Sequence, residues 1–147
     1  LLAHVGELPR PRLVPGAAEL VAGAGVPLGL VTSATRDWAR TCLGDLLDRF
    51  TVVVTRAEVS RGKPDPEPYS LACRKLGVGA EDCCAVEDAP AGVASAVAAG
   101  IGLVIAVSTT FTPHQLEAAH HVVPGLPDVQ LLIARQGVPR ARDTEHT

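Results

Sequence analysis

The sequence contains no methionine and few aromatic residues. Its 147 residues include one tryptophan, one tyrosine and two phenylalanines, so a hydrophobic core must consist mainly of valine, leucine, alanine and isoleucine. A primary translation product begins with methionine, whereas this chain begins with Leu1. We therefore expect a processed, trimmed or partial chain.

Long hydrophobic runs and an excess of positive charge are also missing. No apolar stretch approaches the roughly 20 residues that a membrane-spanning helix requires. The formal net charge is −3, which argues against nonspecific binding to nucleic acid. Hydrophobic residues make up 47% and charged residues 20%, which excludes wholesale disorder and favours one globular domain.

The four cysteines lack the spacing of a zinc or redox motif. No two are separated by two residues, and Cys83 and Cys84 are adjacent, which suits ordinary disulfide geometry poorly. Residues 1–8 lack the basic region and cleavage pattern of a secretory signal. We therefore predict reduced thiols in a cytoplasmic protein, used in core packing rather than catalysis.

Short apolar runs alternate with helical patterns along the chain. We expect strands at about 27–32, 51–54, 83–88, 101–107 and 121–123. We expect helices at about 16–24, 36–48, 67–76, 90–99, 112–120 and 127–136. This alternation predicts an α/β fold with a Rossmann-like parallel sheet, and strands without in–out alternation predict helices on both faces. The domain would span 15–136, after a lead-in over 1–14 and before a polar tail over 137–147.

Polar residues follow several of the expected strands. Thr32 and Ser33 end the first strand, Lys63 lies in the loop after the second, and Glu87 and Asp88 end the third. Ligands of open α/β sheets bind at the carboxyl ends of the strands. We therefore expect hydroxyls, a lysine and two carboxylates to meet at one edge of the sheet.

Each of these groups also has a purely structural interpretation. Ser33 and Thr35 could be helix N-caps, although a hydroxyl beside the free N–H groups of a helix start can also bind phosphate. Arg36 could be a surface helix residue or could reach a substrate phosphate. Glu87 and Asp88 could be acids favoured at a helix start, or ligands of Mg²⁺. The five histidines show no metal-ligand spacing, which suggests surface or packing positions.

Lys63 could be a solvated loop residue, but the composition favours a specific role. Of the 13 basic residues only Lys63 and Lys75 are lysines, which leaves 11 arginines. A lysine between Gly62 and Pro64, in a chain that otherwise uses arginine, suggests a need for a compact point charge.

Three stretches, taken together, resemble the haloacid dehalogenase superfamily. VTSATRDWA, RGKPDPEPY and VEDAPAGVASAVAAG are similar to its second, third and fourth motifs, in that order. They resemble most its branch of sugar- and polyol-phosphate phosphatases and β-phosphoglucomutases, and VSTTF resembles the glycerol- and deoxyglucose-phosphate phosphatases. The resemblance covers about Val14 to Val123.

The resemblance implies a Mg²⁺-dependent hydrolase that takes a phosphoryl group from a small phosphorylated metabolite. Ser33 would hydrogen-bond this group together with the backbone N–H of Ala34, and a register shift of one residue would give the role to Thr32. Lys63 would stabilise the charge that develops in the transition state. The magnesium ion would be held by Asp88, assisted by Glu87, while Arg36 is a weaker substrate-binding candidate.

The resemblance also implies that part of the family's core is missing. Its first motif, an Asp-x-Asp stretch on the central strand, supplies the nucleophile, but residues 1–31 contain no aspartate. The first strand and the cap domain would then be absent, and the isolated chain would be inactive. The strands at 27–32 and 83–87 would flank the missing strand, and they would either close on each other or leave two exposed inner edges.

Other functions stay open. A phosphomutase of the same branch would share these motifs, because the residues that distinguish it lie in the cap. A catalytically dead domain that binds phosphate or a partner would also fit a chain without the nucleophile. A dinucleotide-binding unit is disfavoured, since no G-x-G-x-x-G follows a strand. The sequence predicts neither the substrate nor the oligomeric state.

Overall fold

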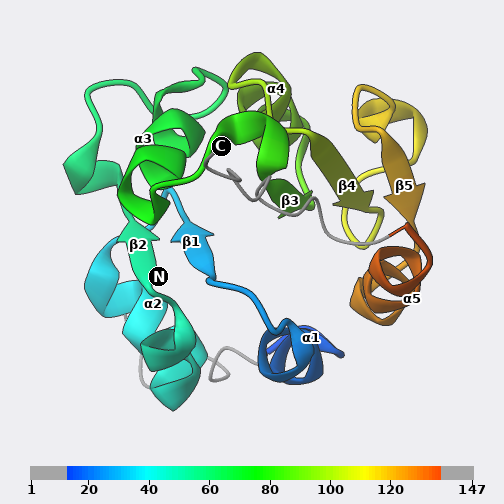
Figure 1. The fold of residues 1–147 in the computed structure, drawn as a ribbon, viewed down its shortest axis with the longest axis horizontal. Coiled ribbons are helices and arrows are strands. Elements are labelled where there is room, and N and C mark those ends of the chain that lie inside the picture. Colours follow the sequence, from blue (N-terminus) through cyan, green and yellow to red (C-terminus); the bar gives the residue numbers. More distant parts are fainter. Residues whose placement is uncertain (1–12, 137–147) are drawn as a thin grey trace, which may run out of the picture.

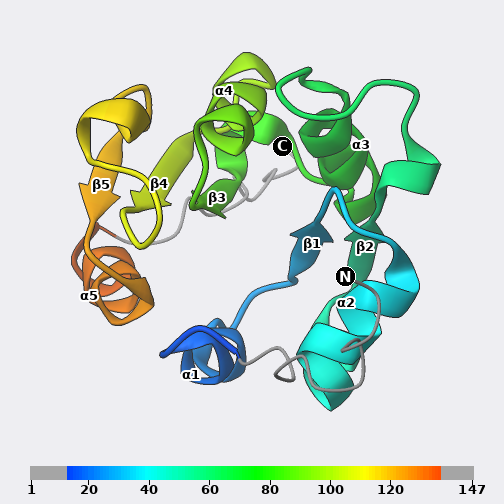
Figure 2. The ribbon, with the colours of Figure 1, turned by 180° about the vertical axis from the view of Figure 1, so that it is seen from behind.

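A computed structural model describes residues 13–136, which form two parallel sheets with helices packed on them (Figures 1 and 2). In the first sheet, β1 (Gly29–Val31) pairs with β2 (Val52–Val54). The second sheet has the order β3 (Cys84–Glu87), β4 (Leu103–Val107) and β5 (His121–Val123). The predicted parallel α/β architecture is confirmed.

Helices pack on both sheets, and they cover both faces of the second sheet. The α-helices are α1 (Ala17–Gly23), α2 (Arg36–Leu43), α3 (Glu67–Leu76), α4 (Pro90–Ala98) and α5 (Leu126–Gln136). The 3₁₀ turns are η2 (Gly44–Arg49), η3 (Arg56–Glu58), η4 (Ala80–Asp82) and η5 (His114–Leu116). Helix α3 packs on β1 and β2, α4 packs on β3 and β4, and α5 packs on β4 and β5 with α1 beside it.

The core lies on both sides of β4. Val104 and Ala106 belong to the apolar cluster that includes Val93 of α4, whereas Ile105 packs with Val129 of α5. Val104, Ile105 and Ala106 are all fully buried. This two-sided burial explains why the strand sequence is apolar throughout and lacks alternation.

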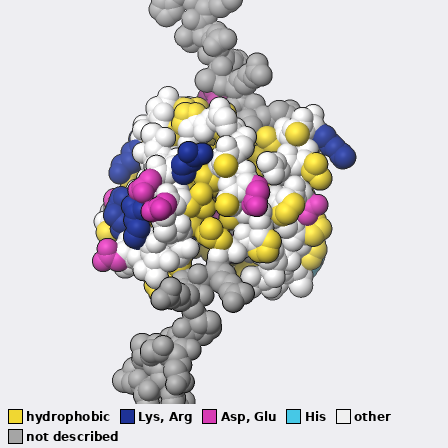
Figure 3. Space-filling view, turned by 90° about the horizontal axis from the view of Figure 1, so that it is seen from below, with side chains coloured by type: hydrophobic (Ala, Val, Ile, Leu, Met, Phe, Trp, Pro, Cys, Tyr) yellow, Lys and Arg dark blue, Asp and Glu magenta, His cyan; other side chains and the backbone are white. Residues whose placement is uncertain are grey.

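The two sheets are not joined to each other within residues 13–136. No pairing links β1 to β3, so the strands expected to flank the missing strand do not close on each other. Figures 1 and 2 show β1 and β2 on one side of the molecule and β3, β4 and β5 on the other. From below, hydrophobic side chains gather in the middle of the molecule, while charged side chains gather mainly at one side (Figure 3).

The prediction of one helix over 36–48 was wrong, because α2 ends at Leu43. Gly44 has φ of +55° and ψ of −134°, a conformation that favours glycine and interrupts the helix. The chain continues as the 3₁₀ turn η2.

The helix predicted over 112–120 was also wrong, since only the 3₁₀ turn η5 forms there. The backbone N–H of His120 donates to the carbonyl of Val104 at 2.9 Å, and His120 Nδ1 accepts from the Val104 N–H at 2.8 Å. These bonds attach the end of the segment to β4 and favour strand pairing over a further helical turn.

The predicted lead-in over 1–14, apart from Leu13 and Val14, and the tail over 137–147 lie outside the described residues. Among the described helices, none has the length and apolar character needed to cross a membrane.

Candidate active site

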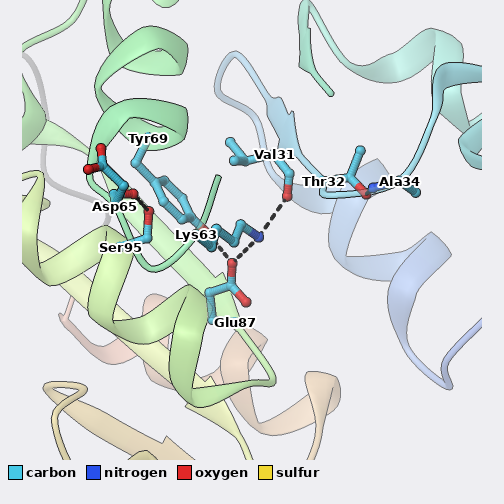
Figure 4. A network of polar contacts seen from close by, with 8 residues as sticks. All are labelled: Val31, Thr32, Ala34, Lys63, Asp65, Tyr69, Glu87 and Ser95. Carbon is cyan, nitrogen blue, oxygen red and sulfur yellow. Dashed lines mark hydrogen bonds and ion pairs between the residues drawn. The ribbon is translucent and has the colours of Figure 1, made fainter. Parts of the chain in front are cut away.

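Lys63 connects the carboxyl ends of the two sheets. Its ammonium group donates to the carbonyl of Val31, at the end of β1, at 3.0 Å and to Glu87 Oε1, at the end of β3, at 2.6 Å. The side chains of Lys63 and Glu87 are only 14% and 7% exposed. Figure 4 shows Lys63 between these two partners, with Thr32 and Ala34 following Val31. The structure therefore brings Lys63 and Glu87 together as the strand order predicts.

Glu87 has a second partner that the sequence analysis missed. The hydroxyl of Tyr69 donates to the same oxygen, Oε1, at 2.5 Å. Burial first, and then the charge of Glu87, raise the pKa of Tyr69 well above its usual value, so its hydroxyl remains a donor. The Lys63 ammonium lies 5.5 Å from the centre of the Tyr69 ring, within cation–π distance. Tyr69 is the sole tyrosine of the chain, a composition signal that could have drawn attention to it.

The loop that carries Lys63 is held by hydrogen bonds on both of its sides. The Ser95 hydroxyl, fully buried on α4, donates to the carbonyl of Asp65 at 2.6 Å. Asp65 Oδ1 accepts from the backbone N–H of Glu67 at 2.9 Å, and the Glu67 carboxylate accepts from two N–H groups earlier in the loop. The position of Lys63 is thus fixed by its backbone as well as by its ammonium group.

The three hydroxyl groups in the loop after β1 have different surroundings. Thr32 Oγ1 accepts from the backbone N–H of Ala34 at 3.1 Å, so this hydroxyl shapes the loop. Thr35 Oγ1 accepts from the Trp38 N–H at 3.2 Å, which confirms Thr35 as the N-cap of α2. Ser33 is exposed, and its hydroxyl has no hydrogen bond within the part of the chain that is described. Ser33 therefore carries the exposed hydroxyl of this loop that no other group of the described residues engages.

Arg36 is paired with a residue of the neighbouring loop. Its guanidinium lies 3.6 Å from Glu58 Oε1, and its side chain is 58% exposed. The Thr55 hydroxyl donates to Glu58 Oε2 and, as the largest cause, lowers the pKa of Glu58. Arg36 also lines a surface hollow beside β2, together with Arg40 and Asp48. The structure places its guanidinium with Glu58 rather than with Lys63.

The two carboxylates at the end of β3 have different surroundings. Glu87 is buried and uses one oxygen for Lys63 and Tyr69, whereas Asp88 is exposed and has no ion-pair partner among residues 13–136. The described residues contain no cluster of three potential metal ligands. A pair of adjacent carboxylates still fits Mg²⁺, which usually takes one or two carboxylates and completes its shell with water and substrate phosphate.

The sequence matches a known protein family. The haloacid dehalogenase-like hydrolases match residues 2–100. The validoxylamine A 7'-phosphate phosphatase of Streptomyces hygroscopicus subsp. limoneus is 40% identical over 87% of this chain and 62% of its own length. Hexitol phosphatase A of Escherichia coli is 40% identical over 68% of this chain and 48% of its length. The β-phosphoglucomutase of Bacillus subtilis is 30% identical over 60% of this chain and 41% of its length.

Solved structures agree with these relationships. CbbY from Rhodobacter sphaeroides, crystallised in complex with phosphate, has a TM-score of 0.73 and 27% identity, and the match covers 80% of this chain and 56% of that one. The chain spans about half the length of the curated relatives that it matches.

Proposed function

Because the chain belongs to the haloacid dehalogenase-like hydrolases, we propose that it forms part of a Mg²⁺-dependent phosphatase of sugar or polyol phosphates. The observation that carries the proposal is Lys63, whose partly buried ammonium group is held by Val31 and Glu87 where the two sheets end. The names of the hexitol phosphatase and of the validoxylamine A 7'-phosphate phosphatase support this class of substrate.

Lys63 and the loop after β1 would bind the transferred phosphoryl group. An ammonium group has three N–H donors, of which Val31 and Glu87 use two, so one remains for a phosphoryl oxygen. The free Ser33 hydroxyl would donate a second bond, and the Ala34 N–H would turn from Thr32 to the phosphoryl group. Of these donors, the Lys63 ammonium is held in place before the substrate binds, which is the condition for electrostatic stabilisation of the transition state.

Asp88 would hold Mg²⁺, with Glu87 assisting from the adjacent position at the end of β3. When bound, this ion would neutralise charge on the phosphoryl oxygens. The exposed carboxylate of Asp88 is accessible to such a hydrated ion.

The nucleophile would come from a segment that this sequence does not contain. An aspartate carboxylate would attack phosphorus and displace the substrate alcohol, and water would then release phosphate from the aspartyl-phosphate. Residues 1–31 contain no aspartate, and β1 and β3 remain unpaired with each other. We therefore expect the 147-residue chain to bind phosphate without turning over a phosphoester.

The test compares this chain with a version extended by the segment encoded directly upstream. An Asp-x-Asp-containing extension should give Mg²⁺-dependent hydrolysis of a hexitol phosphate, and its Lys63→Ala variant should not. An extended protein with no phosphatase activity would contradict the proposed function. Robust Mg²⁺-dependent turnover by the 147-residue chain alone, lost in Lys63→Ala, would contradict only the external nucleophile.

A phosphomutase is the second candidate, favoured by the similarity to the β-phosphoglucomutase of Bacillus subtilis. The same site could return the phosphoryl group to a sugar instead of water. Assaying the extended protein for conversion of one hexose phosphate isomer into another, beside phosphate release, separates the two reactions.

A further inference from the structure

We propose that Tyr69 is a positioning residue that acts through Glu87 to set the ammonium of Lys63. This inference rests on the proposed function in one respect: Lys63 is taken as the group that meets the phosphoryl oxygens. Its basis is the chain of contacts from the Tyr69 hydroxyl to Glu87 Oε1 and from that oxygen to Lys63 Nζ.

The geometry restricts how the Glu87 carboxylate can turn. Tyr69 and Lys63 donate to the same oxygen, at 2.5 Å and 2.6 Å, so both bonds hold Oε1 in one place. Helix α4 also lies directly against the carboxylate, where a Cβ atom on Gly92 would overlap both of its oxygens. Glu87 is therefore held in one orientation, and the direction of its bond to Lys63 is fixed.

The charges give Tyr69 a further effect. Removing a hydrogen-bond donor from an ion pair that is shielded from water leaves the negative charge of the carboxylate with fewer groups to stabilise it. Without the Tyr69 hydroxyl, Glu87 would depend on Lys63 alone and would draw the ammonium away from Val31 and from a phosphoryl ligand. The neutral hydroxyl thus leaves one N–H of Lys63 available to the substrate.

Tyr69 is also a core residue, and packing alone could account for its burial. It is 7% exposed and belongs to the cluster with Cys73 and Ala85. Tyr69→Phe separates the two roles, because it keeps the ring and its packing and removes only the hydroxyl. The phenyl ring would keep its place in this apolar cluster, so the fold should persist.

The test uses the two lysines of the full chain, labelled with ¹⁵N. Lys63 should give a protected side-chain ammonium signal at neutral pH, absent in Lys63→Met, while exposed Lys75 serves as the internal control. In Tyr69→Phe, hydrogen exchange of the Lys63 signal should become about tenfold faster, the change expected for one charge-assisted bond. An unchanged Lys63 signal in folded Tyr69→Phe would overturn the proposal.

Binding of inorganic phosphate in the presence of Mg²⁺ then separates this inference from the proposed function. We expect the wild-type chain to bind and Tyr69→Phe to bind about tenfold more weakly. Equal binding by both, with an unchanged Lys63 signal, would make Tyr69 a packing residue and leave the function standing. A wild-type chain that binds no phosphate, but whose Lys63 signal depends on Tyr69, would contradict the function and not the positioning contact.

Discussion

Gly92 of α4 lies directly against the carboxylate of Glu87, so closely that a Cβ atom at this position would overlap both carboxylate oxygens. The first turns of α4 therefore form one wall of the space that holds Glu87. This contact explains a glycine in the first turn of the helix, although alanine is the better helix former. It also links the helix to the orientation of the Lys63–Glu87 pair.

Gly92→Ala should destabilise the chain despite the better helix propensity of alanine. Overpacking costs about 1–3 kcal/mol, and the displaced carboxylate also loses part of its contact with Lys63. Urea-induced unfolding measures the difference. Gly125→Ala is the matched control, because its nearest neighbour, Pro127 Cδ, would lie 3.6 Å away in ordinary contact. Equal stability of the two variants would show that Glu87 does not occupy this position.

Lys63→Met should lower the free energy of unfolding by about 3–5 kcal/mol, because it leaves a buried carboxylate without its cation. Lys75→Met, at the exposed lysine, should change it by no more than about 0.5 kcal/mol. Denaturant titration of both variants gives the comparison. Adding Glu87→Gln to Lys63→Met should recover part of the loss, and failure to recover any of it would indicate that the charge pair is not the cause.

Thr32 and Ser33 should respond differently to loss of their hydroxyls. Thr32→Val removes the bond to the Ala34 N–H and should cost about 1 kcal/mol of stability. Ser33→Ala should leave stability unchanged and weaken phosphate binding, because this exposed hydroxyl has no other hydrogen bond in the described structure. Calorimetric phosphate titration and thermal melts distinguish the two. The opposite pattern would assign the phosphate contact to Thr32.

Two thiols should resist modification in the native state. Burial raises the pKa of Cys84 to about 11, and burial with the neighbouring Cys73 raises the pKa of Cys83 to about 12. Below pH 9 both thiols are mainly protonated in the folded and in the unfolded chain. As the pH rises through 9 toward these values, the thiols ionise in the unfolded chain first, so the free energy of unfolding falls. A disulfide reagent at pH 8 should therefore label Cys83 and Cys84 slowly until urea is added. Rapid labelling of the folded chain would contradict the raised pKa values.

The sequence predicted the features that depend on local patterns. Apolar runs identified the five strands found within residues 13–136, Thr35 was recognised as a possible cap, and the order of strand ends placed Lys63 with Glu87. Features that depend on tertiary contacts were missed. Tyr69 is 18 residues from Glu87, and nothing in the local sequence shows that their side chains meet. The end of the segment before β5 depends on His120 bonding to β4, a contact that outweighs the helical pattern.

The central claim is that the site around Lys63, at the carboxyl ends of β1 and β3, binds phosphate together with Mg²⁺. Calorimetric titration of the full chain with inorganic phosphate, with and without Mg²⁺, tests it most directly, with Asp88→Asn as the metal-site variant. The account predicts binding that requires Mg²⁺ and is lost in Asp88→Asn, whose exposed carboxylate contributes little to stability. Absence of binding, or binding of equal strength without Mg²⁺ and in Asp88→Asn, would contradict it.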